Sequence, residues 1–320
     1  MHEPGPGQMM DAAALARAAQ TLAVDAVAAT VVGAMRQDGI EPVLLKGPVL
    51  AQWLYGDHEV RGYCDADVLV APDAQLRAER VLTQLGFKRY VREWEPRARR
   101  IMLHDATWVR DSDGGIIDLH RTLPGVRHVS PERAWACLAP HTIEWEMPSP
   151  GGTVRVLDES ARALLVALHA GHHLSGEEAW APPLGDLERA VERLPDDIWA
   201  QAADLAAELR AAGQMSRALH AAEGGAVIAA RLELPPPSSG VDEIVGFERM
   251  AYARGARARI RVIAHAIAPA PDYMRWTSAL ARRGTLGLIV AYLVRPLQFL
   301  GRAPRALRVW LQLRRTGSSG

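Results

Sequence analysis

One stretch of the chain, LLKGPVLAQWLYGDHEVRGYCDADVLV (residues 44–70), constrains its fold more than any other. An apolar segment enters a turn at Lys46 and Gly47, a short helical segment follows, and a second apolar segment carries Asp65 and Asp67. Side chains two residues apart on a strand point to the same face, so the two carboxylates are expected to project together. The stretch therefore predicts a strand, a glycine turn, a helix and a second strand.

The lysine in this turn is unusual for the chain. Lys and Arg together number 37, and among them only Lys46 and Lys88 are lysine. A strand that runs into a glycine turn and then a helix brings backbone N–H groups to one point, which favours anion binding. Gly47 lets a phosphate approach the backbone, and the compact ammonium of Lys46 can contact the same phosphate. The alternative is that Lys46 is an ordinary surface residue of a turn.

A third carboxylate follows on a later predicted strand. Asp118 lies in the segment IIDLH, between apolar neighbours like those of Asp65 and Asp67. If the two strands pair, three acids converge on one patch and repel one another unless a cation lies between them. Mg²⁺ prefers carboxylate oxygens, and two such ions about 3.5–4 Å apart can hold the attacking and leaving oxygens of a phosphoryl transfer. The alternative is that Asp65 and Asp67 form the solvent face of an edge strand.

The remaining segments complete an α+β pattern. Their order is helix, strand, helix, strand, helix and then three strands, which is typical of a mixed sheet with helices on its face. From Glu159 onward the apolar residues follow helical spacing, interrupted by the turn PPPSSG. The expected helices are 11–40, 48–56 and 72–86, and the expected strands are 41–47, 64–71, 87–95, 100–110 and 116–123.

Taken together, these motifs resemble the uncharacterised nucleotidyltransferase family of bacteria, a branch of the DNA polymerase beta-like superfamily. The resemblance covers roughly residues 10–230 and is looser in the helical half, where HAGHH is followed by LGDLERAV. The superfamily usually has Gly-Ser in place of the Lys-Gly turn, and the family usually has a branched aliphatic residue at the position of Ala66. The matching residues are, in chain order, Lys46-Gly47, Arg61, Asp65, Asp67, Leu85-Gly86-Phe87 and Asp118-Leu119-His120.

The resemblance implies a nucleotidyltransferase-like mixed sheet with flanking helices in residues 1–150, followed by an α-helical domain in 151–234. A helical, arginine-rich region is expected in 235–320. The resemblance also implies a role for each motif residue. The expected ligands of Mg²⁺ and catalytic residues are Asp65, Asp67 and Asp118, and the expected nucleotide-binding residues are Lys46, Gly47 and Arg61.

The expected activity is Mg²⁺-dependent transfer of a nucleoside monophosphate from an NTP to a hydroxyl or another nucleophile. The acceptor can be a small molecule, a peptide or a protein. Two alternatives from other classes stay open. One is a non-catalytic nucleotide- or partner-binding accessory protein of a biosynthetic pathway, and the other is a protein that docks on a membrane or RNA through its basic C-terminus.

Two further residues lie near the acidic segments. Arg61 can pair with an aspartate or clamp a triphosphate through two parallel hydrogen bonds. His120 shares a strand face with Asp118 and is either a proton shuttle or, as we favour, a packed edge residue.

Three histidines and an aspartate are candidates for the acceptor side of the expected site, namely His120, His169, His173 and Asp186. His169, His172 and His173 have i, i+3, i+4 spacing and share one helix face. Two histidines four residues apart can bind zinc, but HAGHH lacks the Glu of a metalloprotease helix, so helix packing or acceptor contact is favoured. Asp186 is expected to orient one of these histidines or to cap a helix.

The charge of the chain is distributed unevenly. The formal net charge is zero, yet no acidic residue follows Asp272, whereas nine arginines do. Such a basic end indicates an anionic membrane surface, RNA or an acidic partner, or else only a solvated tail. The apolar run TLGLIVAYLV (285–294) is shorter than the about 20 residues of a bilayer span. It can form part of an amphipathic pair of helices on a bilayer, although core packing is favoured.

The cysteine content and the first residues bear on location. Cys64 and Cys137 have no metal-like spacing and are too few for a disulfide framework. Residues 1–10 contain no apolar stretch, so no signal peptide is expected. A cytoplasmic protein, with peripheral membrane contact as an addition, is therefore expected, and the sequence does not indicate an oligomeric state.

Overall fold

A strand, a glycine turn, a helix and a second strand follow one another as predicted. Strand β1 (Val43–Leu44) enters the turn, helix α2 (Pro48–Leu54) follows, and strand β2 (Ala66–Leu69) carries the second aspartate of the motif. Gly47 adopts φ 67° and ψ −122°, a conformation that residues with a Cβ atom rarely adopt. Pro48 then opens the helix, where a missing N–H leaves nothing unsatisfied. The computed structural model describes residues 6–56, 61–90, 105–126, 129–147, 152–174, 181–235, 255–268, 271, 274, 278 and 280–316.

The described strands form one mixed sheet. Besides β1 and β2, its strands are β3 (Lys88–Arg89), β4 (Asp105–Arg110), β5 (Gly115–His120), β6 (Thr142–Glu146) and β7 (Thr153–Leu157). Their order across the sheet is β3-β4-β5-β2-β1-β7-β6. β2 runs parallel to β5, β1 runs parallel to β7, and the other neighbours are antiparallel. The acidic strand therefore has a neighbour on each side, and the edge-strand alternative is wrong.

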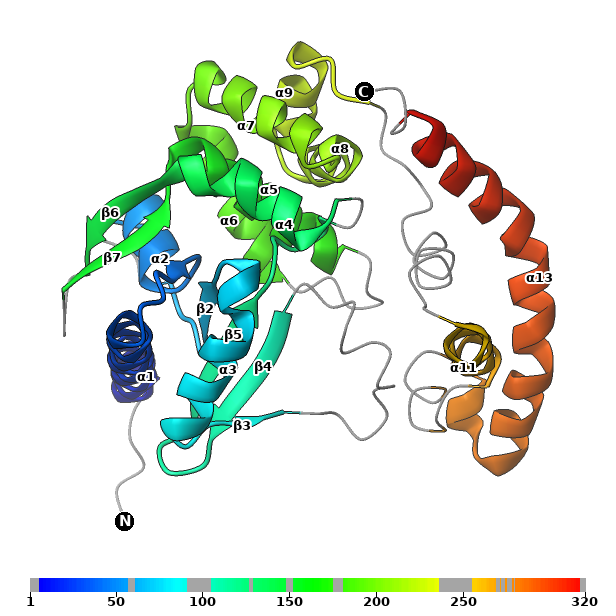
Figure 1. The fold of residues 1–320 in the computed structure, drawn as a ribbon, viewed down its shortest axis with the longest axis horizontal. Helices are drawn as coiled ribbons and strands as arrows, with labels where there is room; N and C mark the ends of the chain where they lie inside the picture. The colour runs from blue at the N-terminus through cyan, green and yellow to red at the C-terminus, as the bar shows by residue number, and fades with distance from the viewer. Residues whose placement is uncertain are drawn as a thin grey trace. The chain divides into compact units, whose positions relative to one another are not determined.

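Apolar residues cover both faces of the sheet, because successive side chains of a strand point to opposite sides. On one face, Val68 and Leu119 pack with helices α1 (Pro6–Gln37) and α3 (Gln75–Gln84). On the other face, Leu69 joins a second buried cluster formed with the later helices, which are labelled in Figure 1. These helices are α4 (Pro131–Leu138), α5 (Glu159–His173), α6 (Ala181–Arg193), α7 (Asp196–Glu208), α8 (Ala212–Ala221) and α9 (Gly225–Arg231).

The chain divides into two compact units. The first holds the sheet and helices α1 to α9, and the second holds α11 (Ala256–Ile267) and α13 (Thr285–Thr316). The predicted α+β fold, a mixed sheet with flanking helices followed by further helices, is confirmed. The predicted boundaries near residues 150 and 234 stay predictions.

One stretch of α1, Ala18–Gln37, is long and apolar enough to cross a membrane by length and composition. In this fold, however, Ala28, Val31 and Met35 of the stretch are fully buried. Helix α1 packs on β2 and β5, so these side chains form part of the core of the first unit.

Among the α13 side chains that the structure describes, those packed within the second unit lie on one side of the helix. Leu288 and Ala291 belong to a small buried cluster with Met274. Leu286 and Leu293 of the same apolar run are exposed. The core-packing interpretation of this run therefore holds for one side of the helix and is wrong for the other.

Candidate functional site

Carboxylates from two segments meet on one face of the sheet. The parallel register of β2 and β5 places Asp67 beside Asp118. Asp65 immediately precedes β2 and lies close enough for the Asp67 charge to act on it. Leu69, two residues after Asp67, belongs to the buried cluster that the later helices form, so this face points toward that cluster. The sheet thus brings together the three carboxylates that the sequence predicted to converge.

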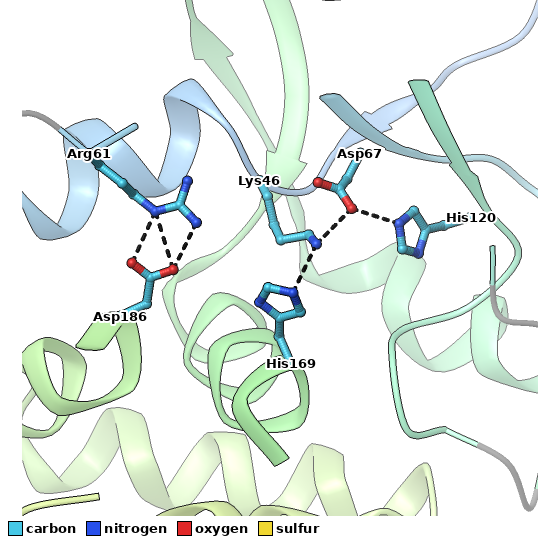
Figure 2. A network of polar contacts seen from close by, with 6 residues as sticks. All are labelled: Lys46, Arg61, Asp67, His120, His169 and Asp186. Carbon is cyan, nitrogen blue, oxygen red and sulfur yellow. Dashed lines mark hydrogen bonds and ion pairs between the residues drawn. The ribbon is translucent and has the colours of Figure 1, made fainter. Parts of the chain in front are cut away.

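Lys46 and His120 bind the same oxygen of Asp67. Lys46 Nζ lies 2.7 Å from Asp67 Oδ1, and His120 Nε2 lies 2.8 Å from it (Figure 2). The exposed fractions of Lys46, Asp67 and His120 are only 9%, 2% and 1%. Such burial of charged groups requires pairing. The surface-lysine alternative is therefore wrong, and so is the expectation of an edge position for His120, because β5 lies between β4 and β2.

Pairing sets the protonation states of these three groups. Burial alone would lower the pKa of Lys46, but the charge and hydrogen bond of Asp67 outweigh burial and raise it. Burial alone would raise the pKa of Asp67, whereas the charge of Lys46 and the hydrogen bond from His120 hold it well below 3.8. Asp67 likewise raises the pKa of His120 against the effect of burial. Lys46 therefore donates as an ammonium to an ionised Asp67.

The other two carboxylates shift in the opposite direction. Burial, together with the charges of Asp67 and Asp105, raises the pKa of Asp118 to about 6. Burial and the Asp67 charge also raise the pKa of Asp65. Thr107 on β4 hydrogen-bonds the Asp118 carboxyl, yet Asp118 Oδ1 is buried and has no hydrogen-bond partner among the described residues. Both carboxylates are therefore short of positive charge, unlike Asp67.

The chemistry of this donor set fits Mg²⁺. Mg²⁺ prefers carboxylate oxygens, and Asp118 Oδ1 lacks the partner that a cation would supply. Within the described ranges, however, no group of three or more His, Cys, Asp or Glu side chains is arranged to hold a metal ion. One reason is that Asp67 Oδ1 already binds Lys46 and His120. The carboxylates are thus of the kind that Mg²⁺ prefers, but in this arrangement Lys46 is the cation on Asp67.

The histidine face of α5 contacts the same lysine. His169 Nε2 lies 3.3 Å from Lys46 Nζ, and because an ammonium can only donate, His169 accepts. Burial and the Lys46 charge lower the pKa of His169 well below 6.5, so its ring is neutral. His173 meets His169 edge to face, with ring centroids 4.8 Å apart, and burial and Lys46 also lower its pKa. His172 meets His173 in the same way at 5.5 Å. The histidine face therefore presents two neutral rings beside the lysine.

Arg61 pairs with Asp186 of α6 and not with an aspartate of the acidic strand. Arg61 Nη2 lies 2.8 Å from Asp186 Oδ2, and Arg61 Nε lies 3.0 Å from Oδ1 (Figure 2). Tyr55 also donates to Asp186 Oδ1, at 2.7 Å. This two-pronged pair ties the segment before β2 to helix α6. Both expectations for Asp186 are wrong, because it lies inside α6 and its carboxylate binds Arg61 and Tyr55 instead of a histidine.

Two tyrosines complete the site, and sequence reasoning missed both. Besides Tyr55, Tyr63 donates to Asp25 Oδ1 of α1 at 2.8 Å, and burial and Asp25 raise the pKa of this tyrosine. The Tyr63 ring lies 3.6 Å from the position that a Cβ atom on Gly47 would take, so it packs against the turn. The signal in the sequence was Asp25, an acidic residue within an apolar helix. Its side chain is 7% exposed in the structure, so it needs a polar partner.

The comparison with known families agrees with the motifs. A family model described as uncharacterised nucleotidyltransferase matches residues 4–224, which include the whole sheet and helices α1 to α8. No curated protein matches the chain. The match confirms the resemblance drawn from the sequence and supports a general role in nucleotidyl transfer.

Proposed function

We propose that this chain, which belongs to the uncharacterised nucleotidyltransferase family, transfers a nucleoside monophosphate from an NTP to an acceptor. The acceptor supplies a hydroxyl or another nucleophile and is a small molecule, a peptide or a protein. One observation carries the proposal: the register of β2 and β5 sets Asp67 beside Asp118, with Asp65 next to them. Carboxylates gathered beside a Lys-Gly turn suit a reaction that releases pyrophosphate.

In this proposal Asp65, Asp67 and Asp118 hold Mg²⁺, as one ion or two. The ion neutralises charge on the triphosphate and on the leaving pyrophosphate. The support for this role is the raised pKa of Asp65 and Asp118, together with the buried Asp118 oxygen that lacks a hydrogen-bond partner among the described residues.

Lys46, Gly47 and Arg61 bind the nucleotide phosphates. Gly47 turns the backbone and adds no side chain of its own, while the Tyr63 ring packs against the turn on the side where a Cβ atom would project. Lys46 is held by Asp67 and by His169. Because the His169 ring is neutral, it does not offset the positive charge of Lys46. Arg61 Nη1 is buried and has no hydrogen-bond partner in the described part of the chain, so it can donate to a phosphate only if the surrounding side chains move.

Asp118 is suited to accept a proton from the attacking nucleophile when it does not bind the ion. Without a bound cation its pKa is about 6, so it is ionised at neutral pH and still basic enough to act. The acceptor oxygen forms a bond to the α-phosphorus as the bond from that phosphorus to pyrophosphate breaks. His169 and His173, neutral in this site, offer hydrogen bonds on the acceptor side, and Asp186 acts by positioning Arg61.

The test is incubation of the full chain with each α-labelled NTP, Mg²⁺ and an extract of metabolites and proteins. Label should reach an acceptor, and Asp67→Asn and Asp118→Asn should slow the transfer about hundredfold or more, as expected when a transition-state charge contact is lost. Asp111→Asn is the matched control, because Asp111 lies in the exposed turn between β4 and β5, away from the site. If no NTP labels any acceptor, or if Asp111→Asn is as slow as Asp67→Asn, the proposal fails.

A non-catalytic nucleotide- or partner-binding protein is the second candidate. The ion pair between Lys46 and Asp67 favours it, because this pair is neutralised without any metal ion. NTP binding measured by calorimetry, unchanged in Asp65→Asn and accompanied by no transfer of label, would establish this candidate in place of the first.

A further inference from the structure

Helix α13 exposes a continuous line of aliphatic side chains. Seven of them are between 38% and 78% exposed, and we call them the α13 stripe. The α13 stripe consists of Leu286, Ile289, Val290, Leu293, Leu297, Leu300 and Leu307.

The spacing of the α13 stripe puts all its members on one side of the helix. At about 100° per residue they fall within a sector about 100° wide. Arg295 lies about 180° from Leu286 by the same rule, and Leu288 and Ala291, which pack within the second unit, also lie outside the sector. The stripe is therefore the side of α13 that its own unit leaves uncovered.

A second, shorter line of the same kind lies on α11, which contacts α13. Ile260, Ile263 and Ile267 are exposed at i, i+3 and i+7 spacing. The exposed aliphatic surface of the second unit thus extends over two helices. Exposed apolar surface on this scale marks a binding surface in a protein that is not aggregated.

The charge beside the stripe selects the chemistry of the partner. Exposed arginines stand at both ends, Arg283 before the stripe and Arg308 after it, and no acidic residue follows Asp272 in the sequence. A partner must therefore be both apolar and anionic. RNA would leave the aliphatic stripe unused, because single-stranded RNA is bound through aromatic stacking. Two stripes packed against each other would bring like charges together.

We propose that α13 lies in the surface of an anionic lipid bilayer, with the α13 stripe among the acyl chains and the arginines against the headgroups. The 22 residues from Leu286 to Leu307 carry aliphatic side chains on one side of the helix, which suits a helix lying along the surface and not one surrounded by acyl chains. Aliphatic burial supplies the affinity, and the arginines select anionic headgroups. The α13 stripe shares no residue with the proposed nucleotide site, so it adds a location to the proposed transfer and not a part of its chemistry.

Sedimentation of the full chain with lipid vesicles tests the proposal. The chain should bind vesicles of phosphatidylcholine mixed with phosphatidylglycerol. Its affinity for vesicles of phosphatidylcholine alone should be weaker by about tenfold or more. The triple change Leu293→Gln, Leu297→Gln and Leu300→Gln keeps helix propensity and should weaken binding about hundredfold or more. The matched control changes to Gln three leucines that are also exposed but lie on the first unit, Leu15, Leu22 and Leu76, and it should bind like the unchanged chain.

Each of the following results would overturn the proposal. The unchanged chain stays in the supernatant with anionic vesicles, or the stripe variant and its control bind alike. A dimer in light scattering that the stripe changes convert to a monomer, without vesicle binding, would assign the stripe to a second copy. Salt-sensitive RNA binding that survives the stripe changes, again without vesicle binding, would assign the arginines to RNA. Nucleotidyl transfer assayed without vesicles is independent of all of these results.

Discussion

The two lysines of the chain form ion pairs of equal length and opposite burial. Lys46 Nζ and Asp67 Oδ1 are 2.7 Å apart, with side chains 11% and 2% exposed. Lys88 Nζ and Asp111 Oδ2 are also 2.7 Å apart, with side chains 77% and 73% exposed. Exchanging each lysine for methionine keeps an unbranched apolar side chain and removes one charge, so the two variants differ mainly in the burial of the charge left behind.

Burial sets the size of the effect. Lys46→Met leaves an ionised, buried Asp67 with only His120 as a partner, and removing one partner of a buried pair costs about 3–5 kcal/mol of the free energy of unfolding. With a denaturant slope of about 2 kcal/mol per M of urea, the midpoint should fall by about 2 M. Lys88→Met should leave the midpoint close to that of the unchanged chain, because solvent already screens its pair.

Urea unfolding at pH 7, followed by far-UV circular dichroism and tryptophan fluorescence, measures both variants. The double variant Lys46→Met with Asp67→Asn should recover much of the loss, because position 67 then carries no buried charge that lacks the lysine. The reasoning is refuted if Lys46→Met and Lys88→Met shift the midpoint equally, or if the double variant is less stable than Lys46→Met alone.

Two further exchanges test the carboxylate patch and the turn. Asp118→Asn should raise the free energy of unfolding at pH 8 by up to about 3 kcal/mol. The pKa of Asp118 is raised from 3.8 to about 6 in the folded chain, and each pH unit of this difference corresponds to about 1.4 kcal/mol. As pH rises, Asp118 ionises in the unfolded chain before it does in the folded chain. The gain from Asp118→Asn should therefore be absent below pH 4, grow up to pH 6 and then stay constant. A variant less stable than the unchanged chain at pH 8 would contradict this prediction. Gly47→Ala should lower the free energy of unfolding by about 1–3 kcal/mol because of its backbone conformation. The control Gly33→Ala lies inside α1 with no atom within 4 Å of the new Cβ, and it should raise the free energy of unfolding by about 0.5–1 kcal/mol. If the two glycine variants respond equally in urea unfolding, the role of the turn is refuted.

The sequence by itself determined the local order of the site and the fold class. Period-two spacing placed Asp65 and Asp67 on one strand face, and a glycine before a proline placed the turn between β1 and α2. The apolar flanks of Asp118 indicated a second strand of the same kind, which the register with β2 confirmed. These features depend on backbone geometry within a few residues, and the residues themselves encode that geometry.

Only the tertiary structure decided which charged groups pair and which apolar residues stay exposed. Lys46 meets His169 across 123 positions of the sequence, and Arg61 meets Asp186 across 125. The spacing of residues within one segment predicted neither pair, because each pair depends on how helices α5 and α6 pack in the first unit. The sequence did not predict which side of α13 stays exposed, for the same reason. Which leucines of this helix are buried depends on the segments that cover it. Burial and pairing are properties of segments that meet in space, and periodicity along one segment does not identify the segment that it will meet.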